Sequence, residues 1–171
     1  FEIYICLSIT KTLSDQEYSY GQMLRTYFAS APQINIRHRF FSDSRDLVNL
    51  ILQTAFLPGK VMLVIATHGL REGLQVEGQS IGPDKLIYGL ELSDTLMLLH
   101  FSSCMIMKGE IPDLIHQATG SSHKFPISGY TTYVDWGMSV VLEFLYFDLI
   151  LCRDYLPRDA AKELFRLVSF A

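Results

Sequence analysis

Residues 61–69, VMLVIATHG, begin as an unbroken apolar run and end at a histidine and a glycine. Residues 96–104, LMLLHFSSC, have the same design and end at two serines and a cysteine. Short, nearly continuous apolar runs are typical of central strands in a parallel sheet, because helices cover both faces of such a sheet. Functional sites in these sheets form beyond the carboxyl ends of the strands. We therefore expect the side chains of His68 and Cys104 to meet at one edge of a sheet.

The composition is that of one globular domain with a sizeable core. The chain has 171 residues, of which 49% are hydrophobic and 19% charged, so it is long enough for one ordinary domain and too short for two. The chain starts at Phe1 and enters a strand directly. We therefore expect residues 1–171 to be a single domain taken from a longer protein.

Charge and hydropathy weigh against two classes of partner. The net charge is −4 and no run of Lys or Arg is present, so direct binding to nucleic acid is not expected. The longest apolar stretch, residues 137–151, contains Glu143 and Asp148. It is also shorter than the roughly 20 residues that a membrane span needs, and no signal-peptide pattern is visible, so no membrane association is expected.

The cysteines favour a reducing compartment. Cys6, Cys104 and Cys152 are an odd number of thiols, widely spaced and in apolar surroundings, which argues against a disulfide framework and for a cytoplasmic protein. Cys6 and Cys152 are predicted to be core residues. His100 lies within an apolar run, and we expect it to be buried and hydrogen-bonded.

Strands and helices are predicted to alternate along the whole chain. Strands are expected over residues 3–8, 34–41, 61–66, 96–102 and 125–130, and helices over residues 15–29, 44–57, 83–92, 112–119, 135–151 and 158–168. Residues 69–81 are predicted to form a small hairpin with its turn at Glu77–Gly78. This alternation predicts a three-layer α/β fold with a mostly parallel sheet and helices on both faces.

Two of these elements carry specific expectations. The strand over residues 34–41 alternates in polarity, which predicts an outer strand with Ile34, Ile36, His38 and Phe40 on its covered face. Ser42 or Ser44 is expected to cap the helix that follows. Asp135 precedes the long helix and is expected to cap it, with a charged lining for a substrate pocket as the second possibility.

A thiol and an imidazole at one edge of a sheet suggest nucleophilic catalysis. A free thiol is mostly protonated at neutral pH, and a neighbouring imidazole can take its proton. We expect Cys104 to be the nucleophile and His68 the general base, and then the acid that protonates the leaving amine. The backbone N–H groups of Gly69 and Cys104 are the candidate donors to the oxyanion, because glycine lets a main chain approach closely.

Other kinds of chemistry lack the residues that they need. The remaining histidines show no metal-ligand spacing and no Cys-x-x-Cys pair is present, so no metal is expected. No glycine-rich phosphate loop follows the first strand and no Gly-x-Ser-x-Gly motif occurs, so neither a nucleotide cofactor nor a serine hydrolase is expected.

These motifs resemble the caspase-like cysteine peptidases, and among them the CHAT branch that is common in bacteria. The similarity rests on residues 66–69, ATHG, on Ser93-Asp94 ahead of the second strand, and on Ser103-Cys104. Residues 128–136, SGYTTYVDW, are similar to the strand and loop that line the caspase substrate cleft and end in a tryptophan. The resemblance implies a six-stranded caspase-like fold, a His/Cys dyad and cleavage of peptide bonds in proteins, and its bacterial members are often tied to defence systems.

The resemblance also indicates where a substrate would bind. Ser102, Tyr133, Asp135 and Trp136 are the candidate substrate-binding residues, together with Thr10–Leu13. The sequence departs from the family after the cysteine, where residues 105–107 are MIM, at Ser102, where caspases carry glutamine, and at Gly137, where caspases carry arginine. Specificity for aspartate is therefore not expected. Only 125 − 104 = 21 positions separate Cys104 from Phe125, so we expect a single-chain enzyme controlled by attached regulatory domains or partner subunits.

Two rival interpretations remain open at this point. The first is a catalytically inactive caspase-like module that acts as a regulatory or protein-binding domain. The second is an α/β domain that binds a small molecule, which would have a closed apolar pocket and would keep His68 away from Cys104.

Overall fold

A parallel sheet forms the middle layer of the molecule. The computed structural model describes residues 1–8, 20–76, 78–92, 94–120 and 125–168. The strands of the central sheet are β1 (Glu2–Ser8), β2 (Asn35–Phe41), β3 (Val61–Ala66), β7 (Leu96–Ser102) and β8 (Ile127–Gly129). They are all parallel and lie in the order β2-β1-β3-β7-β8. The resemblance to caspase-like peptidases implies six strands, and the central sheet of the described residues has five.

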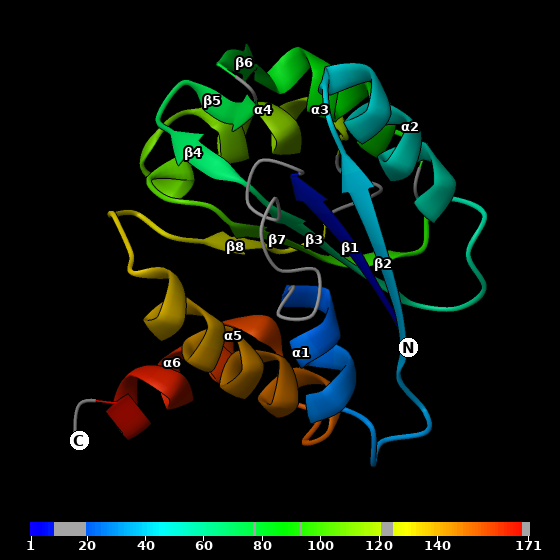
Figure 1. The fold of residues 1–171 in the computed structure, drawn as a ribbon, viewed down its shortest axis with the longest axis vertical. Coiled ribbons are helices and arrows are strands. Elements are labelled where there is room, and N and C mark those ends of the chain that lie inside the picture. The colour runs from blue at the N-terminus through cyan, green and yellow to red at the C-terminus, as the bar shows by residue number, and fades with distance from the viewer. Residues whose placement is uncertain (9–19, 77, 93, 121–124, 169–171) are drawn as a thin grey trace.

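Helices cover both faces of this sheet. They are α1 (Tyr20–Tyr27), α2 (Ser44–Thr54), α3 (Pro83–Leu90), α4 (Ile111–Ala118), α5 (Trp136–Leu151) and α6 (Pro157–Val168). Helices α2, α3 and α4 lie on one face, called the α2 face below, and α1, α5 and α6 lie on the other, the α5 face (Figure 1). The predicted α/β architecture with three layers is thus confirmed.

A second, smaller sheet branches from the end of β3. It is antiparallel and consists of β4 (His68–Leu70), β5 (Gly73–Val76) and β6 (Gln79–Ile81). Val76 pairs with Gln79, which confirms the predicted hairpin, and Gly78 has a positive φ of 77° as such a tight connection requires. Glu77, the other predicted turn residue, lies outside the described residues.

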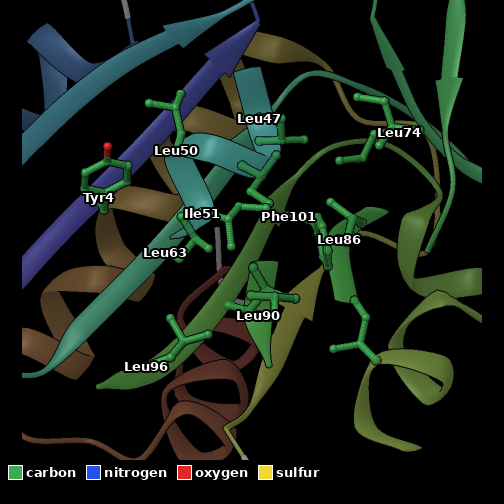
Figure 2. Packing of buried hydrophobic residues seen from close by; sticks show 14 of the residues in the cluster. Tyr4, Leu47, Leu50, Ile51, Leu63, Leu74, Leu86, Leu90, Leu96 and Phe101 are labelled. Atoms are coloured by element: carbon green, nitrogen blue, oxygen red, sulfur yellow. The ribbon is translucent and has the colours of Figure 1, made fainter. Parts of the chain in front are cut away.

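The α2 face holds an apolar core. Figure 2 shows Leu47, Leu50 and Ile51 of α2 and Leu86 and Leu90 of α3 directed toward Leu63 and Phe101 of the sheet. These side chains are at most 9% exposed. The strand β3 is buried along its whole length, as its continuous apolar sequence predicts.

The long helix α5 is apolar on nearly all sides but buries only one of them. Val140, Phe147 and Ile150 pack into the core of the α5 face, whereas Met138 and Val141 are 58% and 55% exposed. In the described structure it packs on the sheet and leaves an apolar stripe exposed.

Three local expectations were wrong in detail. Strand β2 is an outer strand as predicted, but Phe40 is 42% exposed and Phe41 is the buried residue, because Phe41 lies on the α2 face against that core. The cap of α2 is Asp43, whose carboxylate accepts a hydrogen bond of 2.8 Å from Asp46 N, rather than Ser42 or Ser44. Cys152 is exposed because α5 ends there, so it is not a core residue.

Within the described ranges, no helix combines the length and the apolar character needed to cross a bilayer.

Candidate active site

The site is built at the carboxyl ends of two neighbouring strands. Strands β3 and β7 pair in parallel, with Ala66 beside Ser102, so the residues that follow them lie at one edge of the sheet. Thr67 is fully buried and its hydroxyl donates a 2.7 Å hydrogen bond to the Gln75 carbonyl. This bond fixes the point where the chain leaves the central sheet and places His68 as the first residue of β4.

One pocket is shared by the two residues that the sequence singles out. It has a volume of about 330 Å³, and its described lining is His68, Ser102, Ser103, Cys104, Val134, Trp136 and Ser139. His68 is exposed to solvent, and Cys104 is partly buried with a free thiol. The imidazole and the thiol therefore open onto the same space, as the strand order predicts. The small-molecule interpretation predicts a closed apolar pocket and no approach of His68 to Cys104, whereas both residues line the described pocket.

Gly69 packs directly against the backbone of Cys104. A Cβ at this position would overlap the Cys104 carbonyl oxygen and would lie 3.2 Å from the Cys104 nitrogen. The residue after His68 therefore has to be a glycine for the two main chains to approach this closely. The arrangement brings together the two N–H-bearing segments that the sequence nominates for the oxyanion.

The loop after Cys104 is tied to the loop after β8. Met105 has a positive φ of 61°, and the chain then forms the short 3₁₀ helix η3 (Ile106–Lys108). The Met105 N–H donates to the Thr132 carbonyl at 3.2 Å, and the Met107 N–H donates to the Tyr130 carbonyl at 3.1 Å. The thiol of Cys104 donates to the Val134 carbonyl across a long 3.9 Å. These contacts hold the loop after β8 beside Cys104, and Val134 is the residue of that loop that lines the pocket.

The structure divides the candidate substrate-binding residues into two groups. Ser102 and Trp136 line the pocket, and the Trp136 ring also packs against Tyr20 with 5.9 Å between ring centroids. Asp135 caps α5 by accepting a 3.1 Å hydrogen bond from Met138 N, and Tyr133 is 71% exposed. Neither belongs to the described pocket lining. Thr10–Leu13 and Ser93 lie outside the described residues.

Two lining residues, Ser103 and Ser139, were not among the candidate substrate-binding residues. Val134 belongs to residues 131–136, which the sequence placed in the cleft, and it contributes a main-chain carbonyl. A helix places residues three apart on one face, so the expected position of Trp136 at the pocket was a signal that could have indicated Ser139.

Beneath the pocket, a buried polar cluster joins β7, β8 and α5. His100 is 4% exposed, with its Nδ1 2.8 Å from Ser128 Oγ and its Nε2 3.3 Å from Glu143 Oε1. This confirms the expectation that His100 is buried and hydrogen-bonded. The Tyr130 hydroxyl donates to Glu143 Oε1 at 2.9 Å. Sequence reasoning missed Glu143, because an acid with apolar neighbours along a helix carries no sign of its partners.

The cluster keeps its carboxylate charged. Burial acts to raise the pKa of Glu143, but hydrogen bonding and charge from His100, followed by hydrogen bonding from Tyr20 and Ser102, bring that pKa below its ordinary value. Among the described residues, Glu143 Oε1 carries the short hydrogen bond from Tyr130, and Glu143 Oε2 has no hydrogen-bond partner. Burial and the Glu143 charge raise the pKa of Tyr130, which remains a neutral donor.

In the part of the chain that the structure describes, no group of three or more His, Cys, Asp or Glu side chains could hold a metal ion.

Comparison with models of known protein families finds no match, and no curated protein matches the chain. The fold and the site therefore define the protein only as a three-layer α/β domain with a His- and Cys-lined pocket at the carboxyl edge of its sheet.

Proposed function

We propose that this chain is a cysteine endopeptidase of the caspase-like, CHAT-type kind, acting on a protein or peptide substrate. The observation that carries the proposal is a pocket that both His68 and Cys104 line, at the ends of neighbouring strands. Either residue alone would be unremarkable, because buried cysteines and loop histidines are common in proteins without activity. Both residues on one solvent-open pocket are what the chemistry of a thiol nucleophile requires.

The proposed reaction uses the two side chains in sequence. The Cys104 thiolate adds to the carbonyl carbon of the peptide bond, and His68 gives a proton to the leaving amine as the C–N bond breaks. The resulting acyl thioester is then hydrolysed by a water molecule that His68 deprotonates, which restores the free thiol. The Gly69 and Cys104 N–H groups are proposed to hold the oxyanion, supported by the close packing of their backbones.

The pocket supports binding of a substrate side chain. Val134 and Trp136 provide apolar walls, and the lining serines provide hydroxyl groups. A volume of about 330 Å³ is at the small end of the range for ligand sites, which suits one side chain and its flanking main chain. Cytoplasmic localisation is part of the proposal, because a reactive thiol persists best in a reducing compartment.

The decisive experiment is cleavage of a fluorogenic peptide library by the full-length protein. Cys104→Ala and His68→Ala are each expected to lower kcat/KM by about 10³-fold or more while the protein stays folded. Cys152→Ala, at an exposed thiol outside the pocket lining, is the matched control and should retain activity. Iodoacetamide is expected to modify Cys104 faster than Cys152.

Two results would reject the peptidase. One is unchanged cleavage by a folded Cys104→Ala protein, and the other is a Cys104 thiol that reacts no faster than Cys152. The inactive regulatory module would then be the better description of the chain.

A further inference from the structure

The two walls of the pocket belong to different parts of the chain. Cys104 follows β7, whereas Val134, Trp136 and Ser139 belong to the loop after β8 and to the first turns of α5. Strands β7 and β8 pair in parallel below these walls. Beyond the strands, the contacts between the described residues of the two walls include two main-chain hydrogen bonds made by Met105 and Met107, and the long thiol contact to Val134. The distance between the walls thus depends on the contacts that the loop after β8 makes with α5 and β7.

Glu143 contacts the elements that carry both walls. Its Oε1 accepts the Tyr130 hydroxyl at 2.9 Å, and Tyr130 opens the loop that leads to Val134. The same oxygen lies 3.3 Å from His100 Nε2, on the strand that leads to Cys104. Glu143 is 2% exposed and His100 4% exposed, so the contact between them is made in a buried setting where electrostatic interactions are strengthened.

Burying a carboxylate at this position costs free energy. The neighbours of Glu143 along α5 are almost all apolar, and a leucine or methionine there would fill the space without burying a charge. Buried ion pairs seldom add stability over hydrophobic residues of similar volume, so the carboxylate points to a role in geometry. Ser139, one helical turn before Glu143, lines the pocket, and its carbonyl lies 3.3 Å from the Tyr130 hydroxyl.

We propose that Glu143 is a positioning residue that sets the separation between the Cys104 thiol and the Val134 wall, acting through Tyr130 on one side and His100 on the other. The inference rests on the proposed function and deepens it. Glu143 does not touch the reacting atoms, and its effect is transmitted by the elements that it joins.

The test compares Glu143→Leu, Glu143→Gln and Tyr130→Phe in the full-length protein. Glu143→Leu removes the acceptor of the Tyr130 hydroxyl and the partner of the buried His100, so it is expected to melt below the wild-type temperature. At a temperature where it is fully folded, it should lose about tenfold or more in kcat/KM. Most of that loss should appear in KM, because the wall contacts the substrate rather than the reacting bond. Glu143→Gln keeps an oxygen for the Tyr130 hydroxyl and should recover much of the activity.

A double substitution tests whether Tyr130 and Glu143 act through one bond. Tyr130→Phe alone should lose about tenfold in kcat/KM, and adding it to Glu143→Leu should cost no more than Glu143→Leu alone. Tyr88→Phe, at a tyrosine on α3 that is 63% exposed, is the control and should match the wild type. Additive losses, wild-type kinetics in Glu143→Leu, or a Gln variant no better than Leu would overturn the proposal.

Thiol alkylation separates this inference from the peptidase proposal. Release of the Val134 wall should raise the iodoacetamide rate at Cys104 several-fold relative to Cys152 in Glu143→Leu and in Tyr130→Phe. An unchanged ratio would reject the positioning role even if the wild type cleaves peptides. Conversely, a changed ratio in a protein that cleaves no peptide would support the positioning role and reject only the peptidase.

Discussion

The two faces of strand β7 are buried against different kinds of side chain. On the α2 face, Leu99 and Phe101 pack among hydrophobic side chains of three helices. On the α5 face, the alternate residues His100 and Ser102 lie beside the Glu143 carboxylate. The same seven-residue strand thus contributes a tolerant apolar core on one side and a polar cluster with fixed partners on the other. Apolar packing stabilises the fold but is non-directional. The hydrogen bonds of the polar cluster need particular partners, so they specify which elements meet beneath the pocket.

The largest expected effect on stability comes from the apolar side of β7. Phe101 is fully buried, and Phe101→Ala should lower the free energy of unfolding by about 3–5 kcal/mol because it removes buried surface and leaves a cavity. Urea denaturation followed by circular dichroism measures this change. A decrease of less than about 1 kcal/mol in the free energy of unfolding would show that the α2 face repacks around the missing ring. The contrast between the two faces would then be wrong.

A pH-dependent effect of intermediate size is expected on the α5 side of β2. Burial first, and then the charges of Arg25 and Arg39, lower the pKa of His38 from 6.5 to about 4. Between about pH 6.5 and about pH 4, the unfolded chain therefore binds a proton at His38 that the folded chain does not. The free energy of unfolding should therefore fall as the pH drops through this range. His38→Gln should flatten this dependence in melting curves recorded across the window. A wild-type melting temperature that is constant from pH 7 to pH 5 would contradict the assignment.

The smallest effect is expected at the start of α5. Asp135 caps this helix through Met138 N, and Asp135→Ala should cost about 1 kcal/mol in the free energy of unfolding, whereas Asp135→Asn should cost less. Chemical denaturation of the two variants measures the difference. Equal stabilities for Ala, Asn and wild type would mean that the cap contributes nothing, and would return Asp135 to the candidate substrate-binding residues.

Much of the framework of the site could be predicted from short stretches. The runs that became β3 and β7 are continuous in hydrophobicity, and this indicated both their burial and their place beside each other. The positions of His68 and Cys104 after those runs were enough to place them at one edge. His100 was expected to be buried because the residues on both sides of it are apolar.

The contacts across elements could not be predicted in this way. The exposure of Phe40 and the burial of Phe41 depend on which helix covers each face at the sheet edge. Ser139 and the Val134 carbonyl enter the pocket because the loop after β8 is bonded to the loop after Cys104. None of these contacts has a local pattern, because the partners are far apart in the chain.

The sequence by itself determined the alternation of strands and helices, the buried central strands and the residues that end them. Hydrophobic periodicity records these features because burial acts on each segment separately. Only the tertiary structure decided that Glu143, an isolated acid within an apolar helix, would meet His100 and Tyr130 beneath the pocket. The physical reason is that a buried charge is stable only with partners, and its partners are chosen by the packing of elements rather than by their own sequences.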